Sequence, residues 1–203
     1  MIQAVESRRH HVEKLLAAIP EARVTWSLGE GPRGMEGKED ANKTFYRCLL
    51  AAGRDGYIHM EDDVIPCVDW RAKVEAVIEA RPFDVVQFFS RRGKDLTVGS
   101  RWEPGASFTC TVSMYLPPGI PALLAGFYPR YLATRPPRGT NSKGMAGTAW
   151  MDQIIQDWLR STGRRYWLHA PSLVQHAELK SVLGHFVGPR LSASFRDPDP
   201  RFI

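Results

Sequence analysis

Short apolar segments with the composition of β-strands alternate with segments of helical periodicity through the first half of the chain. Residues 22–28 and 57–60 indicate strands, and the apolar residues within 12–18 and 70–80 recur at helical spacing. A chain with this alternation can cover both faces of a mostly parallel sheet with helices. We therefore predict an α/β fold in which a Rossmann-like, mostly parallel sheet is flanked by helices.

The second half of the chain carries the same two patterns less regularly. Residues 91–104 are polar and irregular, and residues 131–147 indicate a loop rich in proline, glycine and basic residues. In α/β sheets the ligand site lies beyond the carboxyl ends of the strands, so polar clusters at such ends matter most. Further strands are expected at 83–89, 108–116 and 166–169, and further helices at 42–52, 120–125 and 151–159.

The composition supports one folded domain. The chain has 203 residues, of which 43% are hydrophobic, enough for a real core and too many for wholesale disorder. No apolar run approaches the roughly 20 residues that span a bilayer, and the opening MIQAVESRRHH is too polar for a signal peptide. We therefore expect a cytoplasmic protein, in the host cytoplasm if it is viral, with no membrane partner. Three widely spaced cysteines, Cys48, Cys67 and Cys110, are expected as buried free thiols.

The charge balance favours an anionic partner. The net charge is +5 and the pI is near 9.3, which suits a nucleotide, a phosphate or a nucleic acid. Basic residues gather in two loops beside Trp102, Tyr128 and Tyr131, and this arrangement could hold a nucleic-acid backbone. Scattered surface arginines are the alternative interpretation. The basic residues concerned are Arg91, Arg92, Lys94, Arg101, Arg130, Arg135, Arg138 and Lys143, with Arg190, Arg196 and Arg201 in the tail.

An acidic triplet directly follows one of the predicted strands. Glu61, Asp62 and Asp63 end the segment YIHMEDD, and three adjacent carboxylates repel one another unless a cation neutralises them. A hard divalent ion such as Mg²⁺ or Mn²⁺ suits such oxygen ligands. Side chains alternate along a strand, so we expect Glu61 and Asp63 on one face and Asp62 on the other. A solvated acidic turn that caps the next helix is the alternative.

A histidine late in the chain offers a further ligand. His176 ends the segment PSLVQH, and its imidazole could complete a metal site with the acidic triplet. The alternative is an ordinary polar residue of a loop.

The pair of motifs YIHMEDDVIP and PSLVQH resembles the GT-A class of nucleotide-sugar glycosyltransferases, which hold a divalent ion on a D-x-D-type motif and often add a late histidine. The resemblance implies one GT-A-like domain over 1–203. Its nucleotide-sugar half would span about 1–90, its acceptor half about 91–185, and a basic tail 186–203. The implied donor is UDP-glucose or a similar nucleotide sugar, with Mn²⁺ or Mg²⁺ as the cofactor.

The resemblance also assigns roles within the acidic triplet and to the late histidine. The triplet Glu61, Asp62 and Asp63 is assigned to cofactor binding, with Glu61 near the ribose or the sugar. Asp63 and His176 are assigned to the metal. Glu61 stands where the motif has Asp, which is a departure from the family pattern.

Two residues near the N-terminus are further candidates for contact with the nucleotide. The end of the strand 22–28 offers Trp26 where the class often has an acidic residue, so Trp26 is assigned to base stacking or, equally, to the core. The opening segment resembles the first strand and loop of these folds. Arg8 is therefore a candidate for the nucleotide, with a solvated helix start as the alternative.

Asp152 resembles the general base of the inverting members of the class. A carboxylate in hydrogen-bond reach of an acceptor hydroxyl can accept its proton as the hydroxyl attacks. The alternative role is stabilisation of the helix dipole in the first turn of the helix 151–159. Asp157, one turn further on, is expected to be an exposed neighbour.

The basic loops make DNA the favoured acceptor. A hydroxymethylpyrimidine in DNA, such as 5-hydroxymethylcytosine, is the acceptor of phage-type base glucosyltransferases, which must expose the base hydroxyl. A surface glycan or lipopolysaccharide is the nearest alternative acceptor. Two other classes stay open: a metal-dependent nuclease and a nucleic-acid binding protein without catalysis.

Overall fold

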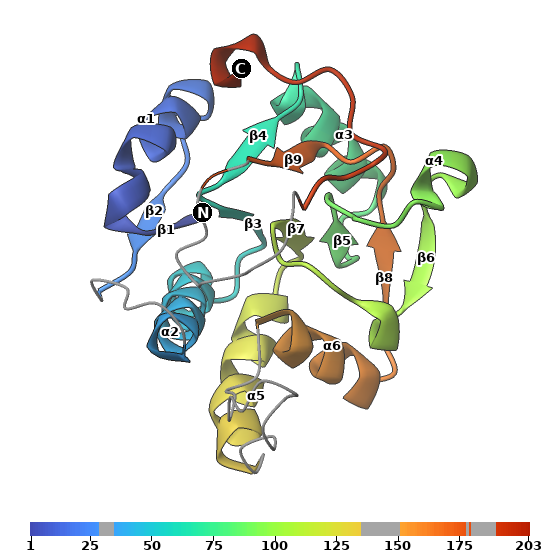
Figure 1. The fold of residues 1–203 in the computed structure, drawn as a ribbon. Coiled ribbons are helices and arrows are strands. Elements are labelled where there is room, and N and C mark those ends of the chain that lie inside the picture. Colours follow the sequence, from blue (N-terminus) through green and yellow to red (C-terminus); the bar gives the residue numbers. More distant parts are fainter. Residues whose placement is uncertain (29–34, 135–150, 178, 180–189) are drawn as a thin grey trace.

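The computed structural model describes residues 1–28, 35–134, 151–177, 179 and 190–203, and it has an α/β fold built on a seven-stranded sheet (Figure 1). The strand order in this sheet is β2-β1-β3-β7-β5-β8-β6. The strands are β1 (Ile2–Ala4), β2 (Val24–Trp26), β3 (Tyr57–Glu61), β5 (Val86–Gln87), β6 (Arg101–Pro104), β7 (Ser113–Leu116) and β8 (Arg165–Leu168). The α-helices are α1 (Arg9–Ala18), α2 (Met35–Ala52), α3 (Trp70–Ala80), α4 (Asp95–Val98), α5 (Ile120–Thr134) and α6 (Met151–Ser161).

The sheet is mixed rather than uniformly parallel. β1 pairs in parallel with β2 and β3, and β5 pairs in parallel with β8. β7 is antiparallel to both β3 and β5, and β6 is antiparallel to β8. The strands β2, β1, β3, β5 and β8 therefore share one direction, whereas β7 and β6 are reversed. The predicted α/β class is confirmed, and most strands run the same way, as a Rossmann-like sheet requires.

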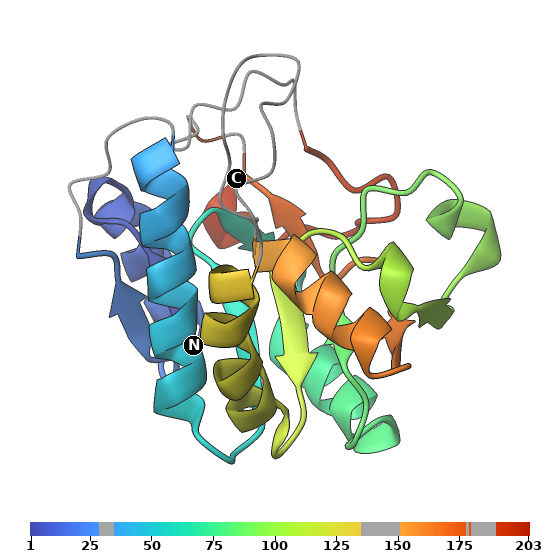
Figure 2. The same ribbon diagram turned by 90° about the horizontal axis from the view of Figure 1, so that it is seen from below.

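Helices cover both faces of the sheet. Figure 2 shows α2, α5 and α6 side by side in front of the sheet, with α3 behind it. Alternate residues of β7 reach two separate hydrophobic clusters: Met114 packs with residues of α2, α5 and α6, and Tyr115 packs with residues of α1 and α3. β7 is therefore buried on both of its faces.

The helices predicted from periodicity are present, with some shifted ends. The helix predicted at 70–80 is α3, which ends before Pro82 because the chain cannot continue a helix into that residue. α5 continues through Pro129 to Thr134, so residues 131–134, predicted as part of a loop, are helical. The strand predicted at 83–89 is reduced to Val86–Gln87.

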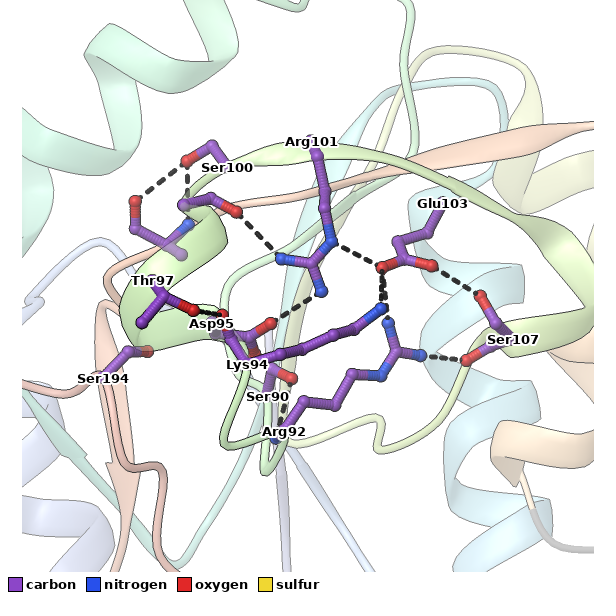
Figure 3. A network of polar contacts seen from close by, with 12 residues as sticks. Ser90, Arg92, Lys94, Asp95, Thr97, Ser100, Arg101, Glu103, Ser107 and Ser194 are labelled. Atoms are coloured by element: carbon purple, nitrogen blue, oxygen red, sulfur yellow. Dashed lines mark hydrogen bonds and ion pairs between the residues drawn. The ribbon is translucent and has the colours of Figure 1, made fainter.

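An ion-pair network orders the polar stretch that was expected to be irregular. Residues 91–104 contain α4 and the edge strand β6. Glu103 Oε1 lies 3.1 Å from Arg92 Nη1, 3.2 Å from Lys94 Nζ and 2.6 Å from Arg101 Nε. Arg101 also binds the buried Asp95 (Figure 3). The segment has no hydrophobic periodicity because charge pairing, rather than apolar burial, holds it in place.

A second, two-stranded sheet lies against the first. β4 (Val64–Pro66) and β9 (Val174–His176) pair in antiparallel orientation, with Val64 opposite His176. The C-terminal residues pack beside this small sheet: the Asp199 N–H donates to the carbonyl of Pro66, and Phe202 is buried. Short 3₁₀ helices occupy Glu6–Arg8, Gly105–Ser107 and Pro200–Phe202.

The composition predicts buried free cysteines and the absence of a membrane-spanning segment. The cysteines are free, and Cys48 and Cys67 are buried as predicted, but Cys110 is partly exposed, because it lies in the loop before β7 rather than within the predicted strand. Among the described residues, none of the helices combines the length and the apolar character needed to cross a bilayer.

Candidate functional site

The acidic triplet and the late histidine meet beyond the end of β3. Glu61 is the last residue of β3, and Asp63 immediately precedes β4. His176 ends β9, and the pairing of Val64 with His176 brings the imidazole to the acidic triplet. One ligand atom each from Glu61, Asp63 and His176 lies within 4.8 Å of the others. The convergence expected from the sequence is therefore present in the fold.

Arg8 forms ion pairs with two members of the acidic triplet, Asp62 and Asp63. Its Nη1 atom is 2.6 Å from Asp62 Oδ1 and 2.7 Å from Asp63 Oδ2, and the guanidinium is buried. Asp62 was expected to point away from Asp63, and this prediction is wrong. β3 ends at Glu61 and the chain turns there, so strand alternation does not continue and both aspartates contact Arg8.

Asp62 is fully engaged within the protein. Its Oδ2 atom accepts a hydrogen bond of 2.7 Å from the Val5 N–H, and its Oδ1 atom accepts one from Arg8. Burial raises the pKa of Asp62, while the charge of Arg8 acts in the opposite direction. These contacts make Asp62 a link between the first loop of the chain and the acidic triplet.

Asp63 and His176 both keep an atom available to a ligand. Asp63 Oδ1 is buried and has no hydrogen-bond partner among the described residues, and Asp63 Oδ2 lies 3.4 Å from His176 Nε2. His176 Nδ1 lies 2.9 Å from the carbonyl oxygen of Ala177. A carbonyl only accepts hydrogen bonds, so in the neutral ring Nδ1 carries the proton and Nε2 presents its lone pair toward Asp63.

Glu61 is a partly buried carboxyl group close to other carboxylates. Burial and the neighbouring charge of Asp63 raise the pKa of Glu61 to about 8, and a hydrogen bond from Thr111 opposes this shift. The Thr111 hydroxyl donates to Glu61 Oε1 over 2.8 Å. Positive charge added beside Glu61 would favour its ionised form.

These residues fit a hard divalent cation. Two carboxylates and one imidazole are ligands that Mg²⁺ and Mn²⁺ accept, and the buried, unpartnered oxygen of Asp63 is a donor atom that the protein itself does not use. The three ligand atoms lie within 4.8 Å of one another, close to the roughly 4.2 Å that separates opposite oxygens on one Mg²⁺.

Asp152 lies in the first turn of α6 and connects to the same region through the loop before β7. Its carboxylate accepts a hydrogen bond of 2.9 Å from the N–H group of Gln153, and the backbone of Cys110 lowers its pKa. Burial raises the pKa of Asp152. The position is also that of a helix-dipole residue, so the structure is compatible with both expected roles.

Asp157 differs from its expectation. It is buried rather than exposed, because its Oδ2 atom accepts a hydrogen bond of 2.6 Å from the Tyr131 hydroxyl and its Oδ1 atom pairs with Arg160 at 2.9 Å. These contacts join α6 to α5, so the role of Asp157 is structural.

The two N-terminal candidates have different surroundings. Trp26 is partly buried at the end of β2, where the guanidinium of Arg9 lies 4.7 Å from its ring centroid. It packs against the cluster that contains α1, and its partial exposure leaves room for the stacking alternative. Arg8 is not at a solvated helix start, because it is buried in its pair with two aspartates.

The basic residues expected to hold a nucleic acid separate into groups. Arg92, Lys94 and Arg101 are paired with acidic side chains in the network of Figure 3, which limits their availability to an anionic partner. Arg201 pairs with Asp199 in the same way. The side chains of Arg91, Arg130 and Arg196 are exposed, and that of Arg190 is partly exposed. Arg135, Arg138 and Lys143 lie outside the described residues.

The sequence interpretation missed the Thr111 hydroxyl and the backbone N–H group of Val5, which bind the carboxylates of Glu61 and Asp62. No local pattern marks them, since each acts on a residue far away in the chain.

Comparisons with known proteins add no assignment: no family model matches the chain, and no curated protein is found as a relative. Function must therefore be argued from the site itself.

Proposed function

We propose that this protein is a metal-dependent glycosyltransferase of the GT-A type that uses a nucleotide-sugar donor, UDP-glucose or a close analogue. The observation that carries the proposal is the meeting of Glu61, Asp63 and His176 beyond the carboxyl end of β3. Ligands of α/β sheets bind at such ends. The resemblance of YIHMEDDVIP and PSLVQH to the motifs of this class supports the same assignment.

Glu61, Asp63 and His176 would hold the cation, and a bound divalent cation supplies positive charge for the diphosphate of the donor. Arg8 adds a fixed positive charge next to Asp63. Arg8 and Asp62 keep the acidic triplet in place, so the role of Asp62 toward the donor is indirect.

Asp152 would act as the general base toward the acceptor hydroxyl. Its burial raises its pKa, which makes its carboxylate a better proton acceptor than an exposed aspartate. The hydroxyl attacks the anomeric carbon, the bond from that carbon to the donor phosphate breaks, and the proton passes to Asp152. Direct displacement of this kind inverts the configuration of the sugar.

A hydroxymethylpyrimidine in DNA is the proposed acceptor. The net charge of +5 and the exposed Arg91 and Arg130 support a polyanionic acceptor. The ion pairs of Arg92, Lys94 and Arg101 reduce this support, so a surface glycan is the second acceptor to test.

Calorimetry with UDP in the presence and absence of Mn²⁺ tests the donor assignment. We expect UDP to bind only with Mn²⁺, and binding to be lost in Asp63→Asn. Equal UDP binding with and without Mn²⁺, or no binding at all, would overturn the proposal. Asp55→Asn changes an exposed aspartate outside the candidate site and serves as the matched control.

Transfer assays test the acceptor. The protein is incubated with UDP-glucose, Mn²⁺ and DNA that contains 5-hydroxymethylcytosine, and the mass of the DNA is measured. We expect a gain of one hexose, and none with unmodified cytosine DNA. Transfer to a lipopolysaccharide acceptor instead would replace the DNA assignment, and cleavage of a plasmid in Mg²⁺ would favour the nuclease class.

A further inference from the structure

Residues 110 and 111 each act on a carboxylate of the candidate site. The Thr111 hydroxyl donates to Glu61 Oε1 at 2.8 Å. The backbone of the preceding residue, Cys110, lowers the pKa of Asp152, against the effect of burial.

A buried side chain from β5 holds the segment of residues 109–111 in place. Gln87 on β5 is 1% exposed, and its Nε2 atom donates to the carbonyl oxygens of Thr109 and Cys110, the latter at 2.9 Å. Cys110 has φ of 68°, in the left-handed region that few residues other than glycine adopt. Such backbone conformations persist where the surroundings over-determine them, and they cluster at functional sites.

The segment also continues into the sheet beside the acidic triplet. The Glu61 N–H donates to the carbonyl of Val112 at 2.9 Å, directly after Thr111. Both the backbone and the side chain of Glu61 are therefore attached to residues 111–112, which leaves the carboxylate little freedom to rotate away from Asp63.

We propose that Thr111 is a positioning residue: its hydroxyl orients Glu61 for the cation. This inference rests on the proposed function. Partners that hydrogen-bond to metal ligands commonly change metal affinity or activity by roughly 10- to 100-fold when they are removed.

Thr111→Val tests the role of the hydroxyl, because valine keeps the shape of threonine and removes its donor. We expect Mn²⁺ to bind this variant roughly 10- to 100-fold more weakly in calorimetry. Thr111→Ser, which keeps the hydroxyl, is the matched control and should bind Mn²⁺ like the wild type. Thr111→Ala is the second variant, in case the valine prevents folding, and it should weaken Mn²⁺ binding in the same way.

A double-mutant cycle measures the contact without metal. The free energies of unfolding of Thr111→Val, Glu61→Gln and the double variant are compared in metal-free buffer, and we expect them to be non-additive because the two side chains are in contact. Additive values would overturn the positioning role.

The two proposals fail in different ways. Wild-type affinity for Mn²⁺ in both Thr111→Val and Thr111→Ala would overturn the positioning role alone. Absence of Mn²⁺ binding by the wild type would overturn the proposed function, and the positioning of a metal ligand with it.

Discussion

His176 Nε2 lies 3.4 Å from Asp63 Oδ2, although the two residues belong to opposite halves of the chain. The small sheet of β4 and β9 creates this contact. β4 starts directly after Asp63, β9 ends at His176, and the antiparallel pairing places Val64 opposite His176. The Ala177 N–H also donates to the carbonyl of Asp63 at 2.6 Å, which adds a backbone contact between the same two segments.

Replacement of Asp63 should abolish cation binding. In Asp63→Ala the site loses both the oxygen that faces His176 and the buried oxygen without a partner, so we expect Mn²⁺ affinity to fall by at least about 100-fold, measured by calorimetry. Asp55→Ala should bind Mn²⁺ like the wild type. A change of less than threefold in Asp63→Ala would show that this carboxylate is not a ligand.

Replacement of Asp152 should separate donor binding from transfer. Asp152→Asn keeps the shape of the side chain and an oxygen that can accept the hydrogen bond from Gln153, but it cannot take up a proton. We expect unchanged Mn²⁺-dependent UDP binding and a transfer rate lower by about 10²- to 10⁴-fold. The rate is measured with saturating donor. A normal rate would leave Asp152 with the helix-dipole role only.

Much of the architecture follows from local sequence patterns. The apolar periodicity of 70–80 with Pro82 behind it predicts α3, and the apolar run before Glu61 predicts β3. The coincidence of acidic residues with a strand end predicts where the site lies, because ligands of α/β sheets bind beyond the carboxyl ends of the strands. These are features that a few neighbouring residues determine.

The remaining features depend on contacts between distant residues. β6 has no alternating pattern because Arg101 and Glu103 are stabilised by an ion-pair network rather than by burial of apolar side chains. Asp62 points toward Arg8 because the chain turns after Glu61, which strand periodicity does not predict. No local sequence pattern identifies Thr111 as part of the site, since its partner Glu61 lies on β3, far away in the chain.

Arg8 should contribute strongly to stability. Removal of one partner from a buried ion pair leaves uncompensated charge, here on Asp62 and Asp63, and typically costs about 3–5 kcal/mol. We expect Arg8→Met to lose this amount in urea denaturation at pH 7. Arg9→Met changes a neighbouring arginine whose ion pair with Glu6 is exposed, and it should lower the free energy of unfolding far less than Arg8→Met. Equal losses in the two variants would contradict the central position of Arg8.

His59 should make the protein sensitive to acid. Its ring is completely buried on β3 near the ring of Phe45, and neither ring nitrogen has a hydrogen-bond partner among the described residues. Burial lowers the pKa of His59 from 6.5 to about 3. The unfolded chain therefore takes up a proton below pH 6.5 that the folded protein does not bind until about pH 3. Stability is fully present above pH 6.5 and falls as the pH decreases through this window.

Thermal unfolding of His59→Met between pH 4 and pH 7.5 tests this effect. Methionine fills a similar volume and cannot be protonated, so the difference in Tm between the variant and the wild type should shift in favour of the variant as the pH falls below 6.5. His10→Met, which replaces an exposed histidine, controls for the loss of an imidazole and should follow the wild-type curve. Parallel curves for His59→Met and the wild type would mean that His59 is protonated in the folded protein without cost.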